Sequence, residues 1–310
     1  MKYFITGGCG FIGSHIAEEL ISRGDEVVIY DNLSTGYKHN IEHINGNCSF
    51  IQGDIQDLPL MSEAMKGADY VFHEAAMVSV FESIERPEDN NSINVTGTLN
   101  VLLAARENNV KRAVLASSAA IYGNDPALPK TELMLPVPES PYAMSKIAGE
   151  HYMRVFARLY NVETVVLRYF NVFGPRQDSS SMYSGVISKF HETLLNRTSP
   201  IIYGDGRQSR DFVYVKDVVR ANLMAMESDQ VGKGEVFNIA TGKAKNLLDL
   251  FDTMNRVLAT DIKPIHKKVR SGDIRHSLAS ADKAKALLGW EPEYSFENGL
   301  SEFIRQSEKK

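Results

Sequence analysis

A glycine-rich turn between a strand and a helix constrains the fold of this chain more than any other feature. Residues Thr6–Gly13 are Thr-Gly-Gly-Cys-Gly-Phe-Ile-Gly; they follow the apolar run Tyr3–Ile5 and lead into a helical pattern near Phe11. In such a turn the glycines permit a tight bend, close approach of backbone N–H groups to a pyrophosphate, and close packing of helix on strand. The positive end of the helix then faces the phosphates. We therefore expect a dinucleotide site.

A second strand supports this expectation and indicates which dinucleotide binds. The run Glu26–Tyr30 ends at Asp31, about 20 residues after the loop, where an acidic side chain can accept both ribose hydroxyls. Because the same carboxylate would repel a 2′-phosphate, the sequence predicts NAD rather than NADP. The alternative is that the glycines mark only a structural turn. The loop residues expected at the cofactor are Gly7, Gly10, Phe11, Ile12 and Gly13.

Size and composition limit the class of protein. The chain has 310 residues, enough for one large α/β domain or two lobes, and carries two widely separated cysteines and a net charge of −5. Lys and Arg are scattered, which argues against nucleic acid as the main partner. No stretch reaches the ~20 apolar residues of a membrane span. We expect a cytoplasmic protein that contacts no membrane.

The order of apolar runs predicts the architecture. Strand-like runs alternate with helical patterns through the first half, which is typical of a parallel sheet covered on both faces. We expect an α/β fold: a Rossmann-type doubly wound parallel sheet with a smaller α/β lobe that caps the substrate. Residues 1–168 would form the NAD-binding domain, rejoined by segments near 211–257, and residues 169–310 mainly the capping lobe. Strand signals at Asp211–Val215 and Val236–Ala240 are expected to return the chain to the sheet.

Three side chains form a candidate catalytic group. The strand Ala113–Ala116 ends in two hydroxyl residues, the second of which is Ser118, and a later helix contains Tyr142 and Lys146. Residues four apart share a helix face, so the Lys146 ammonium is expected to lie beside the Tyr142 phenol and lower its pKa. A phenol with a lowered pKa can act as a general base near neutral pH.

These features together resemble the extended short-chain dehydrogenase/reductase family, and within it the UDP-sugar 4-epimerases. The resemblance covers nearly the whole chain. The residues that carry it are the loop from Thr6, Asp31-Asn32, Asp54-Ile55, His73-Glu74-Ala75-Ala76, Asn94, Ser117-Ser118-Ala119, Tyr122-Gly123, Tyr142 with Lys146, Arg168-Tyr169-Phe170-Asn171, and Gly206 through Asp217.

The resemblance implies roles at the cofactor. Asp54 and Ile55 would hold the adenine, Ala75 and Ser117 would line the nicotinamide side, and Lys146 would touch the nicotinamide ribose. Asn32 and Asn94 would be further cofactor-binding residues. Two simpler interpretations stay open, since Asp54 could cap a helix and His73 could support the site from behind. The histidines show no metal-ligand spacing, and we expect no metal.

The resemblance also implies a reaction. Tyr142, assisted by Ser118, would take the proton of the sugar 4-OH while the C4 hydride moves to NAD, giving a transient 4-keto sugar that receives hydride on its opposite face. Asn171 would bind the substrate pyrophosphate, and Tyr203 and Asp273 would lie near the uridine ribose. Arginine suits phosphate, and two arginines are candidate clamps, although each could equally form a surface ion pair: Arg210 and Arg270.

Neighbouring residues separate this chain from relatives with the same fold. Where 4,6-dehydratases of this family carry Thr-Asp-Glu, this chain has Ser118-Ala119-Ala120, and alanine cannot transfer protons, which disfavours dehydration.

In the epimerases a gate residue lies beside the sugar C2 substituent, seven positions after the diphosphate-binding arginine. Counted from Arg270, the gate residue of this chain is Ser277. A small residue leaves room for an N-acetyl group, so the expected substrates are UDP-GlcNAc and UDP-GalNAc, with UDP-Glc and UDP-Gal alongside. The simpler interpretation is that Ser277 begins a turn.

The sequence leaves other functions open and indicates an assembly state. A different NAD-dependent nucleotide-sugar or small-molecule dehydrogenase has the same fold, and a non-catalytic relative could sense NAD or bind RNA. By resemblance the helices Asn94–Asn108 and Tyr142–Tyr160 would pair with their copies to form a four-helix homodimer interface, unless their apolar residues serve only the core of one subunit.

Overall fold

A seven-stranded parallel sheet forms the centre of the molecule. The computed structural model describes residues 1–178, 185–268 and 275–307. The strand order is β3-β2-β1-β4-β5-β6-β10, and every neighbouring pair is parallel. The strands are β1 (Lys2–Thr6), β2 (Glu26–Asp31), β3 (Cys48–Gln52), β4 (Tyr70–His73), β5 (Arg112–Ser118), β6 (Glu163–Tyr169) and β10 (Lys233–Ile239). The expected doubly wound fold is confirmed.

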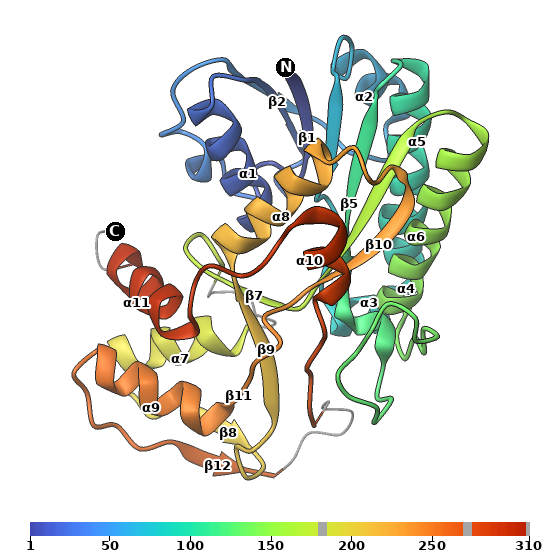
Figure 1. The fold of residues 1–310 in the computed structure, drawn as a ribbon. Helices are drawn as coiled ribbons and strands as arrows, with labels where there is room; N and C mark the ends of the chain where they lie inside the picture. The colour runs from blue at the N-terminus through green and yellow to red at the C-terminus, as the bar shows by residue number, and fades with distance from the viewer. Residues whose placement is uncertain (179–184, 269–274, 308–310) are drawn as a thin grey trace.

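Helices cover both faces of this sheet (Figure 1). On one face α1 (Phe11–Ser22) and α8 (Val215–Glu227) lie side by side. On the other face lie α2 (Leu58–Ala64), α5 (Gly97–Glu107) and α6 (Pro141–Leu159). The buried residues of the two faces form separate apolar clusters, one centred on Ile5 and Phe72 and one on Phe4 and Val71. Since β1 is flanked by β2 and β4, the strand order reverses there and leaves a crevice at the carboxyl edge.

A smaller lobe follows the sheet, below it in Figure 1. Its elements are β7 (Asn171–Phe173), α7 (Val186–Leu195), β8 (Ile201–Tyr203), β9 (Ser209–Tyr214), β11 (Ala244–Asn246), α9 (Leu247–Val257), β12 (Ile265–Lys267) and α11 (Phe296–Ser307). Strands β11, β9 and β7 form one small sheet, and β12 and β8 another. A third apolar cluster, which includes Phe190, Phe251 and Phe303, holds α7, α9 and α11 together.

The expectation that Asp211–Val215 returns to the large sheet is wrong. Strand β9 instead pairs in parallel with β7 and antiparallel with β11, and Val215 already belongs to α8. The reason is that Asn171–Phe173, which lies in a stretch rich in Gly and Pro, supplies a strand partner of its own. The second expected return is confirmed, because β10 adds to the sheet beside β6.

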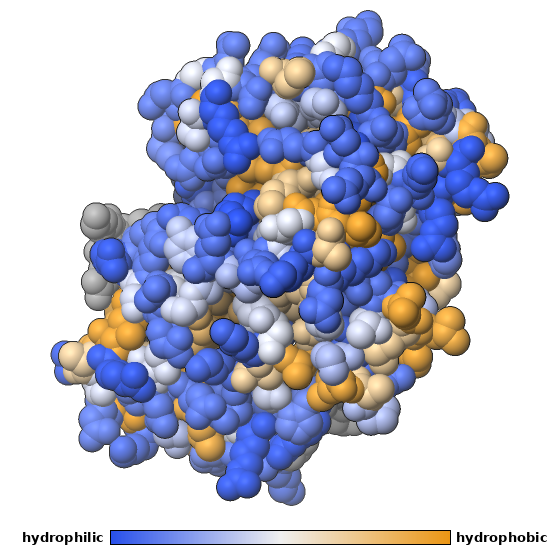
Figure 2. Space-filling view, viewed as in Figure 1, coloured by the Kyte–Doolittle hydropathy of each residue, from blue (hydrophilic) through white to orange (hydrophobic). Residues whose placement is uncertain are grey.

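Short helices complete the chain. They are α3 (Val80–Glu85), α4 (Pro87–Asn90), α10 (Asp282–Leu288), the 3₁₀ turns Lys38–Asn40 and Ala119–Tyr122, and a π-helical stretch at Asn91–Thr96. Most of the face drawn in Figure 2 is hydrophilic, with apolar side chains gathered near its middle. Within the described ranges, no helix combines the length and apolar character needed to cross a lipid bilayer.

Candidate active site

The glycine-rich loop has the geometry of an anion site. Gly7 adopts φ +70°, and a Cβ on Gly13 would lie 2.4 Å from the carbonyl oxygen of Gly7. The loop therefore tolerates no side chain at Gly13 without moving the backbone. Gly10 occupies the N-cap of α1, where no side chain caps the helix and no acidic residue lies in the first turn. The amides of this first turn, including that of Phe11, are thus available to phosphate oxygens.

Asp31 lies at the carboxyl end of β2, next to this loop. Its side chain is buried, and its two oxygens accept hydrogen bonds from the amides of Cys9 at 2.9 Å and Leu33 at 2.8 Å. Burial raises the pKa of the carboxyl, while the two amides act in the opposite direction. Because each carboxylate oxygen has two lone pairs, both can still accept a ribose hydroxyl. The loop and Asp31 therefore fit a dinucleotide without a 2′-phosphate.

Asp54 follows the end of β3 and lies beside Asn32, which follows the end of β2. Its side chain accepts hydrogen bonds from the Asn32 amide group at 2.8 Å and from the backbone of Gln56 at 2.9 Å. The side chain of Asp57, not that of Asp54, caps α2 by accepting from Leu60. The alternative role of Asp54 as a helix cap is therefore not the arrangement found. Asp54 and Asn32 instead form one polar edge at the place where the adenine is expected.

A chain of hydrogen bonds runs beneath the loop through His73. The Ala75 amide donates to the Thr6 hydroxyl at 3.3 Å, Thr6 contacts Nδ1 of His73 at 2.7 Å, and Nε2 contacts the Thr98 hydroxyl at 2.9 Å. Since Thr98 donates its own proton to the carbonyl of Asn94 at 2.6 Å, Nε2 of His73 must carry the hydrogen. Burial lowers the pKa of His73 to about 3, so the ring is neutral and supports Ala75 from behind.

This neutral histidine predicts that acid destabilises the protein. Between pH 6.5 and about 3 the unfolded chain protonates His73 and the folded chain does not, so the free energy of unfolding falls as pH falls through that window. The limiting slope is about 1.4 kcal/mol per pH unit. In denaturant melts at successive pH values, the free energy of unfolding of His73→Gln should fall less steeply with falling pH than that of the parent. The reason is that glutamine keeps a donor and an acceptor but does not titrate.

The comparison between parent and His73→Gln isolates this group. Glu74 acts in the opposite direction between about pH 7 and 4.5, because its folded pKa is raised, but it is present in both proteins. Parallel stability curves for the two proteins would contradict the assignment of a neutral, proton-excluding His73.

Asn94 ties the turn after β4 to α6. Its amide group accepts from the backbone of Met77 at 2.8 Å and donates to the Met77 carbonyl and to the Ser145 hydroxyl, both at 3.0 Å. Ser145 in turn donates to the carbonyl of Tyr142 at 2.8 Å. Both N–H groups of the Asn94 side chain thus bond to protein groups, and the side chain connects the expected nicotinamide side to the helix that carries Tyr142.

Ser118, Tyr142 and Lys146 come together at the carboxyl edge of the sheet. Ser118 ends β5, and α6 begins at Pro141 behind a Ser140 cap, which places Tyr142 in the first turn. The Lys146 ammonium donates to the carbonyl of Ala116 at 2.8 Å and lies over the Tyr142 ring, 5.8 Å from its centre. The predicted grouping is therefore present.

The expected lowering of the Tyr142 pKa is not found. Burial of the phenol is the largest effect and raises its pKa, and a hydrogen bond with Ser118 acts in the opposite direction. The physical reason is that Lys146 directs its proton toward a backbone carbonyl and is itself desolvated, which lowers its pKa to about 8. Ser118, rather than Lys146, is the group that eases ionisation of the phenol here.

Ser117 faces the interior and joins a network that sequence reasoning missed. Its hydroxyl donates to Glu150 on α6 at 2.6 Å, and Arg168 binds both carboxylate oxygens of Glu150 at 2.9 and 2.7 Å. Arg168 also donates to the hydroxyl of Tyr122, which donates to Asn238 at 2.6 Å. This buried ion pair anchors the end of β5. No local sequence pattern predicts this network, because its members come from separate strands and helices.

A second group that sequence reasoning missed lies near Lys146, one of the candidate catalytic residues. The hydroxyl of Tyr169 contacts Glu74 at 2.9 Å and the side chain of Asn222 at 2.7 Å. Burial raises the pKa of Glu74 to about 7, against the effect of the Tyr169 hydrogen bond and the Lys146 charge. Ala75, the next residue, is expected at the nicotinamide, so Glu74 lies at the same carboxyl edge of the sheet.

The expected substrate residues lie in the smaller lobe. Asn171 opens β7, Arg210 lies on the adjacent strand β9, and Tyr203 ends β8. The Ser277 amide donates to the carbonyl of Ser209, the residue before Arg210, at 3.0 Å. The residues expected as the sugar gate and as one arginine clamp, Ser277 and Arg210, therefore lie on neighbouring segments. Arg270 and Asp273 lie outside the described residues. Across the part of the chain that is described, no three His, Cys, Asp or Glu side chains are placed to hold a metal ion.

Comparisons with known proteins agree with this geometry. A family model described as the NAD dependent epimerase/dehydratase family matches residues 3–240. The chain is 42% identical to a putative UDP-glucose 4-epimerase of Methanocaldococcus jannaschii over 97% of this chain and 96% of that protein.

Two solved structures are similar over almost their whole length. One is a UDP-N-acetylglucosamine 4-epimerase from Methanobrevibacter ruminantium in complex with UDP-N-acetylmuramic acid, with 42% identity, a TM-score of 0.95, and coverage of 99% of this chain and 98% of that one. The other is a UDP-glucose 4-epimerase from Thermotoga maritima with UDP-glucose, with 40% identity, a TM-score of 0.95, and coverage of 100% and 99%.

Proposed function

Since the chain belongs to the NAD-dependent epimerase/dehydratase family, we propose that it interconverts UDP-GlcNAc and UDP-GalNAc, and also UDP-Glc and UDP-Gal, by inverting C4 of the hexose. It is an NAD-dependent isomerase of the UDP-sugar 4-epimerase type. The single observation that carries the substrate proposal is the position of Ser277, a small residue bound to the strand of the arginine clamp.

NAD fits the residues at the carboxyl edge of the large sheet. The amides at the start of α1 would hold its pyrophosphate, Asp31 its adenosine ribose, and Asp54 with Asn32 its adenine edge. When bound, NAD would supply a reversible hydride acceptor for C4 of the sugar. Residues 1–168, rejoined by α8 and β10, would form the domain that holds it, and most of residues 169–310 would hold the UDP-sugar.

The proton of the sugar 4-OH is handled by Tyr142. Its buried phenol is protonated at rest because burial raises its pKa, and the hydrogen bond with Ser118 provides a path along which that proton can be shared. The Lys146 ammonium lies over the Tyr142 ring and donates to the Ala116 carbonyl, beside the place expected for the nicotinamide ribose. Tyr142 acts as a base only after its resting proton has left past the Ser118 hydroxyl to solvent. The phenolate then accepts the 4-OH proton as the 4-keto sugar forms, and it returns that proton to the C4 oxygen when hydride adds to the opposite face of the sugar.

Product analysis tests this function in both directions. Purified protein incubated with UDP-GlcNAc should yield UDP-GalNAc, and UDP-GalNAc should yield the same final mixture, as measured by proton NMR of the sugar C4 position. Absence of either product would refute the substrate proposal. A keto sugar accumulating in proportion to added NAD would indicate a dehydrogenase instead.

Asp31→Ala should weaken NAD binding and relax discrimination against NADP. Removing a charged acceptor from two ribose hydroxyls lowers affinity by about 1.5–3 kcal/mol, and it also removes the repulsion of a 2′-phosphate. The measurement is the ratio of NAD to NADP dissociation constants by calorimetry. A collapsed loop would weaken the binding of NAD and NADP equally. An unchanged ratio of their dissociation constants would therefore contradict the ribose assignment.

We further propose that the protein is a homodimer through α5 and α6. Several apolar side chains of α6 and its end are exposed in the single chain: Met144, Val155, Leu159 and Tyr160. Pairing with a second copy would bury them in a four-helix interface. Sedimentation at micromolar concentration should give twice the monomer mass, and Leu159→Asp should shift the population toward monomer. A parent protein that sediments only at 34.5 kDa would exclude the dimer.

A further inference from the structure

One buried carboxylate outside the catalytic group joins the segments that surround the expected sugar site. Asp211 follows Arg210 in β9 and is fully buried. One oxygen accepts from the Thr241 amide at 2.7 Å and the Thr241 hydroxyl at 2.6 Å, and the other from Gly242 at 3.0 Å and Ala279 at 3.4 Å. All four partners are donors. A carboxylate can accept all of them, whereas an amide side chain would turn a donor toward some.

The side chains of Arg210 and Asp211 lie on opposite faces of β9, because successive side chains of a strand point to alternate faces. Arg210 belongs to the face expected to bind the diphosphate. Asp211 is directed the other way, toward residues 275–280, which we call the gate segment because it contains Ser277. The chain thus places the clamp and the anchor of the gate in consecutive positions of one strand.

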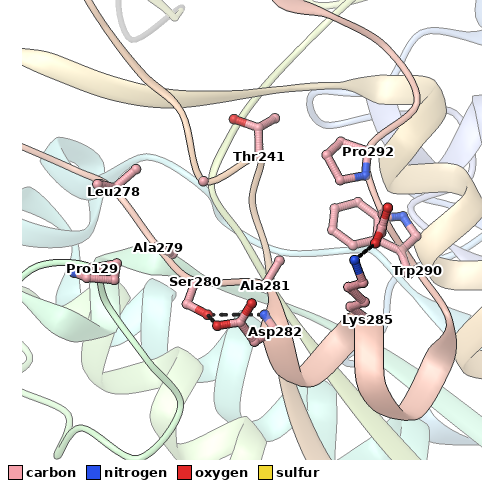
Figure 3. Close-up of a pocket in the computed structure, with 12 residues that line it drawn as sticks. Pro129, Thr241, Leu278, Ala279, Ser280, Ala281, Asp282, Lys285, Trp290 and Pro292 are labelled. Atoms are coloured by element: carbon pink, nitrogen blue, oxygen red, sulfur yellow. Dashed lines mark hydrogen bonds and ion pairs between the residues drawn. The ribbon is translucent and has the colours of Figure 1, made fainter.

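Asp211 adds a side-chain attachment to a gate segment that backbone hydrogen bonds also hold at both ends. At its start, Ser209 and the gate segment exchange two hydrogen bonds of 3.0 Å, from Ser209 to Arg275 and from Ser277 to Ser209. At its end, Lys130 bonds to residues 278 and 280 on the side away from β9. Figure 3 shows the gate segment from Leu278 onward passing between Pro129 and Thr241. Ala279 lies between the two residues that bond to Lys130, and its own amide is directed to β9, where the Asp211 carboxylate accepts it.

We propose that Asp211 is a positioning residue that sets how far the sugar gate stands from the diphosphate clamp, and thereby how well the site holds an N-acetylated UDP-sugar. The proposal rests on the proposed function of Arg210 and Ser277. Asp211 touches no substrate. It acts by holding Ala279, two residues after Ser277, and the Thr241–Gly242 turn against the strand that carries Arg210.

Asp217 provides a matched control. It is also fully buried, and it accepts from the amides of Glu293 at 2.8 Å and Tyr294 at 3.1 Å and pairs with Arg220 at 3.3 Å. Its partners belong to the segment before α11 and to α8, and none belongs to the gate segment. Asp217→Asn therefore removes a comparable buried charge without releasing Ala279.

The experiment compares Asp211→Asn, Asp217→Asn and the parent holoenzyme. Asp211→Asn should raise KM for UDP-GlcNAc at least about tenfold with a smaller change in kcat, and lower the ratio of kcat/KM for UDP-GlcNAc to that for UDP-Glc. Asp217→Asn should lower Tm but leave KM and this ratio at parental values. Equal KM and equal ratios in the two variants would overturn the proposal.

Two further measurements keep the test decisive. Ala279→Pro removes the N–H donor that reaches Asp211 and should reproduce the rise in KM, so a parental KM in this variant contradicts the proposal even if Asp211→Asn fails to fold. If the parent does not act on UDP-GlcNAc, the proposed function fails, and UDP affinity by calorimetry still decides the inference. Asp211→Asn should then bind UDP more weakly than Asp217→Asn, and equal affinities would refute it.

Discussion

Replacing Tyr142 with Phe is expected to lower turnover by at least about 10²-fold while leaving the fold and NAD binding intact. In the proposed mechanism the Tyr142 phenol is the group that exchanges a proton with the sugar, and phenylalanine keeps the ring but loses the hydroxyl. Steady-state kcat for UDP-sugar epimerisation is the measurement. Ser118→Ala should cause a smaller loss, because it removes a hydrogen bond to the phenol rather than the proton acceptor.

Tyr122→Phe is the matched control for this variant. Tyr122 is also buried near the end of β5, and its hydroxyl bonds to Asn238 and Arg168 rather than to the catalytic residues. Its loss should lower stability by about 1–3 kcal/mol and reduce kcat far less than Tyr142→Phe. Parental turnover in Tyr142→Phe, or equal losses in the two variants, would show that Tyr142 is not the base.

Ser277→Tyr is expected to suppress the N-acetylated reaction and spare UDP-galactose. The added ring would occupy the volume proposed for the acetamido group, and overfilling a packed site opposes binding by about 1–3 kcal/mol, or roughly 5- to 150-fold. The ratio of kcat/KM for UDP-GalNAc to that for UDP-Gal measures the effect directly.

Ser277→Ala separates size from chemistry in this experiment. It keeps a small side chain and leaves the backbone bond from residue 277 to Ser209 in place, so both substrate classes should react near parental rates. If Ser277→Tyr slows the reactions of N-acetylated and unsubstituted UDP-sugars equally, other residues set the size of the sugar pocket and the gate assignment is wrong.

Local sequence patterns predict the sheet well and the small lobe less well. The β-α alternation and the glycine loop lead to the doubly wound sheet, since periodicity and turn chemistry are properties of adjacent residues. The place of β9 could not be found this way. Its partner β7 has three residues within a Gly- and Pro-rich stretch, too short for alternation to distinguish it from a loop.

The same limit applies to the site. Helix spacing brings Tyr142 and Lys146 together, but it does not reveal that Lys146 bonds to Ala116 and that burial raises the Tyr142 pKa. Those effects depend on which distant backbone groups and side chains surround the pair. The Thr6–His73–Thr98 chain and the Asp211 contacts are hidden for the same reason, because each joins segments far apart in sequence.

The most direct test of C4 epimerisation follows the hydrogen on C4. UDP-GlcNAc carrying deuterium at C4 should give UDP-GalNAc that retains the deuterium at C4 when the reaction is run in ordinary water, because the hydrogen is removed and returned within the closed site without exchange. Mass spectrometry and NMR of the product sugar measure its position and content. Loss of the label to solvent, or an absence of UDP-GalNAc, would contradict the account.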